Sequence, residues 1–182
     1  MLSNFLKYGM LAVPFAVSIS AYGVDYFSDS QAQKILFPEA DEFKKKAVAL
    51  SDEQRLQIKK ISGVAQRNAN PDVWEAKKKG IPIGLFFKDE VVGKHEYITY
   101  ALAVSPSGSV LGIEIMSYRE THGGEIRQKN WLKNFIGKKI SDPFKLDNDV
   151  PNITGATLSS RNVLDGVKRL LAVQIQLNEK AN

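Results

Sequence analysis

The sequence has no cysteine among its 182 residues. This absence excludes disulfide bonds, a thiolate nucleophile, and iron–sulfur or zinc sites with cysteine ligands within this chain. It also excludes haem attached through a C-x-x-C-H motif and a lipid anchor on cysteine. Any redox chemistry on this chain therefore needs another cofactor.

Histidine is scarce, and the positive charge is not concentrated in one region. His95 and His122 lie far apart without a nearby carboxylate pattern, so we predict no metal site and no catalytic residue. The 25 Lys and Arg exceed the 20 Asp and Glu by five, and the excess is spread along the chain, with a short run at Lys77–Lys79. That run is expected to be a solvated helix end, and the composition does not favour nucleic-acid binding.

Long apolar runs are absent except near the N-terminus. The segment from Tyr8 to Val24 has no charged residue, follows Lys7 and precedes Asp25. A basic start, a short apolar stretch and small residues near its end are typical of a secretory signal peptide or a membrane anchor. We therefore predict that residues 1–24 direct export, either to the periplasm or to an anchored position outside the cytoplasm; a buried core helix is the alternative.

The next part of the chain, residues 25–80, is expected to be a helical extension. A short helix is predicted from about Ser30 to Leu36 because Pro38 follows it, and Ser51 with Gln54 forms a capping-box pattern before a helix reaching about Ser62. The whole chain, with 43% hydrophobic and 25% charged residues, has the composition of a globular protein, and one domain is placed at residues 81–176.

Residues 81–118 have the pattern of three consecutive strands, which predicts an antiparallel meander. In the third strand, alternation places Val110, Gly112, Glu114 and Met116 on one face. A Gly-rich loop, a short helix at about 130–139 and an irregular segment at 141–153 follow. A long helix from about Leu158 to Leu177 carries an apolar face, formed by Val163, Val167, Leu170, Leu171 and either Gln174 or Ile175. The predicted fold is α+β, an antiparallel sheet with the C-terminal helix packed on it.

The stretch Thr154-Gly155-Ala156-Thr157-Leu158-Ser159 lies where a loop enters this last helix. Unpaired N–H groups at a helix start favour an anion such as phosphate, and Gly155 allows a close approach to the backbone. The alternative is structural, because a threonine before a helix is commonly only an N-cap.

Six motifs around this stretch follow one another in the order found in a known protein family: Tyr118–Glu125, Trp131, Phe135–Lys138, Thr154–Thr157, Leu158–Arg161 and Asp165–Val167. With these motifs, residues 81–176 resemble the FMN-binding domain family, whose members include subunits of the sodium-translocating NADH:quinone oxidoreductase and of the Rnf complex, and small exported flavoproteins. The family commonly has an Asp six residues before the end of the T-G-A-T motif, where this chain has Pro151.

The resemblance implies a covalent cofactor. In this family a flavin transferase joins the phosphate of FMN to the hydroxyl of the last motif residue, here Thr157, through a phosphoester. By resemblance, the cofactor-binding residues are Glu120, Thr121, Gly124, Trp131, Thr154, Gly155, Ala156, Thr157, Leu158 and Ser159. Trp131 either walls the flavin ring or belongs to the core, His95 is expected to be structural, and His122 is a hypothetical tuner of the flavin.

The implied function is electron transfer between redox proteins, with a quinone-linked membrane complex or a cytochrome as donor or acceptor. Membrane association would come through residues 1–24. Two alternatives stay open: a non-catalytic exported module that binds a phosphate ligand reversibly, and a flavin-dependent reductase with its own small substrate.

Overall fold

The computed structural model describes residues 24–179. Apart from Val24, the predicted signal peptide or anchor at residues 1–24 lies outside the described residues. Within residues 24–179, no helix is both long and apolar enough to cross a membrane.

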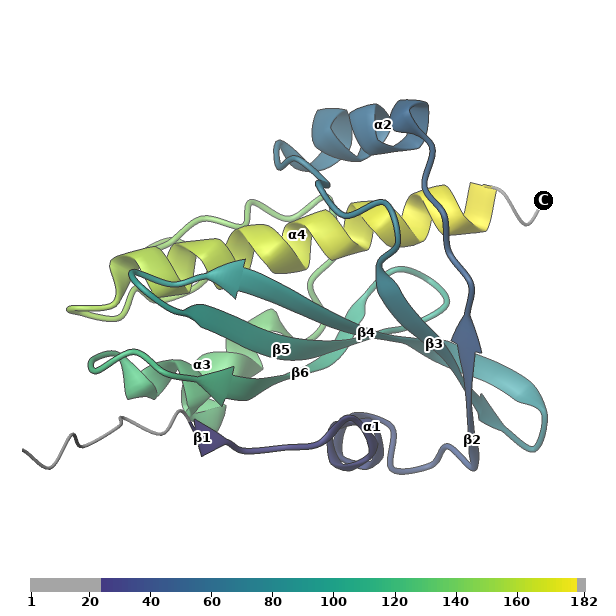
Figure 1. Cartoon of the computed structure of the whole chain (residues 1–182), viewed down its shortest axis with the longest axis horizontal. Coiled ribbons are helices and arrows are strands. Elements are labelled where there is room, and N and C mark those ends of the chain that lie inside the picture. The colour runs from purple at the N-terminus through teal and green to yellow at the C-terminus, as the bar shows by residue number, and fades with distance from the viewer. Residues whose placement is uncertain (1–23, 180–182) are drawn as a thin grey trace, which may run out of the picture.

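A single antiparallel sheet forms the centre of the molecule, with strands in the order β1-β6-β5-β4-β3-β2 (Figure 1). The long strands from β3 to β6 follow one another as a meander, and the two edges are formed by segments from the N-terminal part of the chain. The strands are β1 (Val24–Asp25), β2 (Glu42–Lys46), β3 (Asp72–Lys78), β4 (Ile81–Val92), β5 (Tyr97–Val104) and β6 (Val110–Tyr118).

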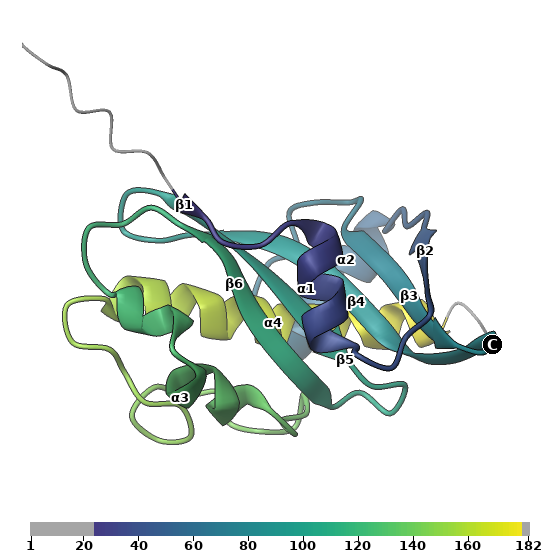
Figure 2. The same cartoon turned by 90° about the horizontal axis from the view of Figure 1, so that it is seen from below.

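Helices cover both faces of this sheet. The long C-terminal helix lies across one face with α2 packed against its outer side, and α1 lies on the opposite face (Figures 1 and 2). The helices are α1 (Asp29–Leu36), α2 (Asp52–Ser62), α3 (Lys129–Leu132) and α4 (Thr157–Glu179), with short 3-10 turns η1 (Gly124–Arg127) and η2 (Lys133–Phe135). The α+β prediction, with the C-terminal helix on an antiparallel sheet, is confirmed.

The predicted helical extension needs a correction, because it also supplies strands. Both predicted helices are present, and each begins with a complete capping box, at Ser28 and at Ser51. However, β2 and β3 extend the sheet, so Lys77 and Lys78 lie in a strand rather than at a helix end. Cross-strand charge pairs, such as Lys45 with Asp72, stabilise this part of the sheet. Whether residue 80 is a true domain boundary stays a prediction.

The main core lies between the sheet and α4. Val163, Val167, Leu170 and Leu171 are buried there, as predicted, and Gln174 is buried rather than Ile175. Because α2 covers the outer side of α4, the buried surface of this helix is wider than a single apolar stripe.

The side chains of β6 do not alternate regularly between the two faces of the sheet. The register with β5 shifts between Ala103 and Val104, and this irregularity turns Val110 toward the α4 core together with Ile113. Gly112 faces α1 instead, where an added Cβ would lie 2.8 Å from Leu36. The predicted common face of Val110 and Gly112 is therefore wrong.

A buried polar network fixes α4 on the sheet. The Arg169 guanidinium donates to Gln66 Oε1 at 2.6 Å and also to the Asp89 carboxylate, which accepts from the Tyr100 hydroxyl at 2.6 Å. Burial raises the pKa of Tyr100 well above its ordinary value, so the phenol stays a neutral donor. The helix that begins at Thr157 is thus held in one position relative to β4 and β5.

Candidate functional site

The start of α4 lacks the side-chain cap that α1 and α2 have. Ala156 precedes the helix, and its carbonyl accepts from Ser160 N at 2.9 Å, but alanine has no side-chain oxygen to receive an N–H. Among the described residues, no side chain caps the first N–H groups of α4, and together with the helix dipole these groups form a site suited to an anion. Thr157 is the first residue of the helix rather than its cap.

The Thr157 side chain is exposed at this position, and its Oγ1 accepts a hydrogen bond from Asn152 Nδ2 at 3.2 Å. Just before it, Gly155 has a φ of +80°, and no atom beyond its chain neighbours lies within 4 Å of the place where a Cβ would be. The backbone is consequently open to a bulky group beside the threonine hydroxyl.

A second loop, distant in sequence, packs directly against this turn. Gly123 has a φ of +84°, and a Cβ there would collide with the Cβ of Ala156. The Tyr118 hydroxyl donates to the His122 carbonyl at the same place and lies beside Ser159. Burial raises the pKa of Tyr118, which keeps it a neutral donor.

These two loops and the turn between β4 and β5 enclose a pocket of about 300 Å³. Its lining includes seven of the predicted cofactor-binding residues: Glu120, Thr121, Gly155, Ala156, Thr157, Leu158 and Ser159. His122, Lys94 and His95 complete the wall. Lys94 was not predicted, and His95, expected to be structural, faces the pocket because the hairpin turn brings it there.

Glu120 connects the loop to this hairpin turn. Its Oε1 accepts from His95 N at 2.6 Å and from Glu96 N at 3.0 Å, and an added Cβ on Gly93 would lie 2.5 Å from the same oxygen. Partial burial acts to raise the pKa of Glu120, but hydrogen bonds from the backbone N–H groups of the turn outweigh it and lower the pKa. Glu120 therefore positions the turn that carries Lys94.

Residues 93–172 match the FMN-binding domain family. This part of the chain belongs to that family. The matched segment begins at the β4–β5 turn and ends within α4, so it contains every lining residue of the pocket.

Several known proteins are similar to this chain. A component of the ion-translocating oxidoreductase complex of Stutzerimonas stutzeri is 27% identical over 114 residues, covering 57% of this chain and 50% of that protein. A component of the proton-translocating ferredoxin:NAD(+) oxidoreductase complex of Clostridium ljungdahlii is 28% identical over 125 residues, covering 65% and 68%. The crystal structure of Shewanella oneidensis NqrC has 16% identity and a TM-score of 0.48, covering 75% of this chain and 68% of that one. The chain spans about half the length of several of the curated relatives it matches.

Three of the predicted FMN-binding residues lie outside the pocket. Thr154 is exposed on the turn before it, and Gly124 begins η1, where it lines a neighbouring hollow of about 590 Å³. Trp131 is only 5% exposed, packs edge-on against Phe135 at 5.0 Å and donates from Nε1 to the Pro151 carbonyl at 2.8 Å. Its place in the FMN-binding domain is therefore in the core, where it fixes the loop leading to Thr157.

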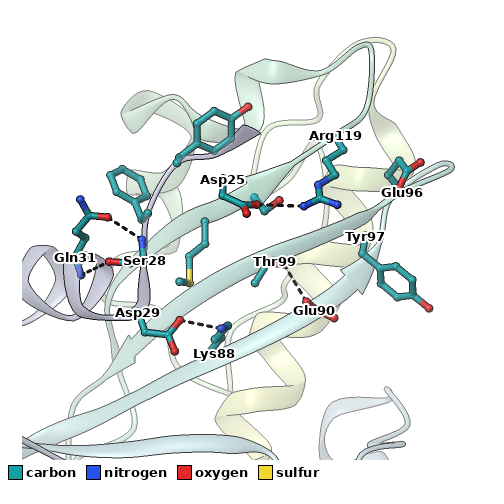
Figure 3. A pocket seen from close by; sticks show the side chains of 14 residues that line it. Asp25, Ser28, Asp29, Gln31, Lys88, Glu90, Glu96, Tyr97, Thr99 and Arg119 are labelled. Carbon is teal, nitrogen blue, oxygen red and sulfur yellow. Dashed lines mark hydrogen bonds and ion pairs between the residues drawn. The ribbon is translucent and has the colours of Figure 1, made fainter. Parts of the chain in front are cut away.

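A groove of about 790 Å³ lies on the sheet face that carries α1 (Figure 3). Its charges are largely paired with one another: Lys88 with Asp29 at 2.8 Å and Arg119 with Asp25 at 3.4 Å. These pairs join β1 to the residue that follows β6 and the first residue of α1 to β4, and none of the predicted cofactor-binding residues lines this groove.

The contact between Glu120 and the hairpin turn predicts a pH-dependent stability. Glu120→Gln keeps an oxygen acceptor but removes the charge, so we expect a loss of about 1 kcal/mol near neutral pH. Because the folded-state pKa of Glu120 is lowered, its contribution is fully present above the ordinary value of about 4.3 and is lost as the pH falls through the folded value. Thermal unfolding of both proteins at about pH 7 and about pH 3 should show the difference closing at acidic pH. An equal difference at both would contradict this role.

Proposed function

We propose that this chain is an exported electron-transfer protein whose FMN is attached by a phosphoester to Thr157. The observation that carries the proposal is the exposed Thr157 hydroxyl at the uncapped start of α4, on the wall of a pocket within the matched family segment. A phosphodiester at that position would receive the first N–H groups of the helix as donors.

The surrounding residues fit an anionic, phosphate-linked group. Lys94 supplies a positive charge on the pocket wall, and Glu120, the acidic residue of that wall, is occupied by hydrogen bonds to the hairpin turn. Gly155 leaves the backbone open for a bulky substituent. FMN, when bound, supplies one- or two-electron redox chemistry, while the chain supplies its position and electrostatic surroundings.

The partners follow from the same proposal. Maturation requires a flavin transferase, and electron relay requires a redox protein as donor and another as acceptor, such as a quinone-linked membrane complex or a cytochrome. The relatives are named as components of ion-translocating oxidoreductase complexes, and these names support a membrane redox complex as one partner. The apolar run from Tyr8 to Val24 supports export, with the domain in the periplasm or anchored outside the cytoplasm.

The intact mass of the exported protein, produced together with a flavin transferase, tests this function. We expect an increase of one FMN minus one water, because the group joined to the threonine oxygen is FMN without the elements of one water molecule. An unmodified protein that binds a phosphate compound reversibly would instead support the binding-module alternative. Turnover of a small acceptor without any partner protein would support the reductase alternative.

A further inference from the structure

Asn152 is the residue that contacts the reactive oxygen of the proposed site. Its Nδ2 donates to Thr157 Oγ1 at 3.2 Å, and among the described residues no other side chain forms a hydrogen bond with that oxygen. The two residues lie five positions apart, on opposite sides of the turn formed by Thr154 and Gly155.

The backbone around Asn152 is held rigidly from several directions. The preceding carbonyl, that of Pro151, accepts from Trp131 Nε1 at 2.8 Å, and Asn152 N donates to Asp147 Oδ1 at 3.2 Å. After it, the buried Ile153 accepts from Ala156 N at 2.9 Å through its carbonyl. The backbone that carries the Asn152 amide is therefore held in one position, whereas the Thr157 side chain is exposed.

The Asn152 amide has no other hydrogen-bonding task among the described residues. Its Oδ1 is buried without a hydrogen-bond partner among these residues, although burying an unpaired polar atom is unfavourable. Among the described residues, Thr157 Oγ1 is the one hydrogen-bond partner of the Asn152 side chain, so the geometry directs this amide to Thr157. A polar side chain held in this way fits a role at Thr157.

We propose, on the basis of the function proposed above, that Asn152 is a positioning residue for the attachment of FMN to Thr157. The co-reactant is a flavin dinucleotide, whose pyrophosphate provides a leaving group. The Thr157 O–H bond and one P–O bond of the pyrophosphate break, and a new bond forms between Oγ1 and the FMN phosphorus. AMP leaves with the bonding electron pair, and the proton passes to a base of the transferase or to solvent.

The donor character of the amide suits this step. By donating to one lone pair of Oγ1, Nδ2 selects one rotamer of the hydroxyl while leaving its second lone pair and its proton available. A neutral N–H donor also tolerates an approaching phosphoryl anion, whereas a carboxylate at the same place would repel it. The role therefore requires asparagine rather than its isosteric acid.

The test compares three variants of the full chain as substrates of a flavin transferase supplied with flavin dinucleotide. Asn152→Ala removes the amide, Asn152→Asp keeps its shape but replaces the donor with a charged acceptor, and Asn162→Ala is the matched control. Asn162 also donates a side-chain amide hydrogen bond near the site, to the Val92 carbonyl at 2.6 Å, but it does not contact Thr157.

We expect the initial rate of flavin incorporation at saturating acceptor concentration to fall about tenfold for Asn152→Ala, corresponding to one lost hydrogen bond. Asn152→Asp should fall further, on the order of a hundredfold, and Asn162→Ala should match the wild type. The loss should appear in kcat more than in KM and should persist well below the Tm of each variant. A purely structural role would instead make the rate follow the Tm.

Different failures are distinguishable. If the wild type takes up flavin and both Asn152 variants do so at the wild-type rate, the positioning role is overturned while the proposed function stands. If Asn162→Ala slows as much as Asn152→Ala, the role is likewise overturned. If the wild type itself gains no FMN, the proposed function fails, and this inference fails with it. Should Asn152→Ala not fold, the isosteric Asn152→Asp still decides the matter.

Discussion

Replacement of Thr157 by alanine is expected to abolish covalent flavin attachment completely while leaving the fold intact. The variant lacks the oxygen that would form the ester. Neither more transferase nor more flavin dinucleotide can replace this missing nucleophile. The Thr157 side chain is exposed, and within residues 24–179 its one hydrogen bond is with Asn152, so the loss of stability should not exceed about 1 kcal/mol. Intact mass and visible flavin absorbance of the exported proteins measure the result.

A control variant separates the hydroxyl from the rest of the side chain. Thr157→Ser retains the nucleophile at the same exposed position and should still gain one FMN minus one water. If Thr157→Ala kept the mass increase, the flavin would be attached elsewhere, and the proposal for this residue would be wrong.

Local signals made much of the fold predictable. The capping boxes at Ser28 and Ser51 and the apolar spacing in α4 concern neighbours in the chain, and the structure places helices at each of these positions. The strands β2 and β3 were missed because lysine and glutamate occupy much of their length. The pairing of β2 with β3 also joins residues far apart in sequence, although β3 itself turns directly into β4. The irregularity in β6 arises from its register with β5, which alternation within one strand does not reveal.

The motif at Thr154–Thr157 predicted an anion site by its own chemistry, because a Gly-containing turn at a helix start exposes backbone N–H groups. The attachment role of Thr157 and the roles of Glu120 and Thr121, which also line the pocket, came instead from the resemblance to the family. Lys94 and His95 could not be predicted as site residues, because only the pairing of β4 with β5 and the contact with Glu120 bring their turn to the pocket. The sequence around a single tryptophan such as Trp131 does not distinguish a residue that lines a cofactor from a residue of the core. The structure shows that Trp131 donates a hydrogen bond to the Pro151 carbonyl, which describes its structural role alone.

The second large effect is expected at Gly123, where the two loops of the site touch. Gly123→Ala places a Cβ in collision with the Cβ of Ala156 and 2.7 Å from the Tyr118 hydroxyl, an approach that real atoms do not adopt. The loop and the start of α4 must then separate, which opens the pocket wall beside Thr157. We expect flavin incorporation to fall at least about tenfold and stability to fall by about 2–4 kcal/mol, through the combined costs of backbone strain and overpacking.

Gly137→Ala provides a matched control, because it places alanine in the same left-handed backbone conformation without a collision of the new Cβ with another residue. Gly137 has a φ of +81°, nearly equal to the +84° of Gly123, yet no atom beyond its chain neighbours lies within 4 Å of its absent Cβ. Both variants therefore incur the cost of a left-handed alanine, about 1 kcal/mol, and only Gly123→Ala also moves the loops apart. With thermal unfolding and flavin incorporation measured well below each Tm, Gly137→Ala should lose some stability but be modified like the wild type. Equal incorporation by the two variants would mean that the contact between Gly123 and Ala156 does not shape the acceptor site, and that the turn at Thr154–Thr157 is sufficient by itself.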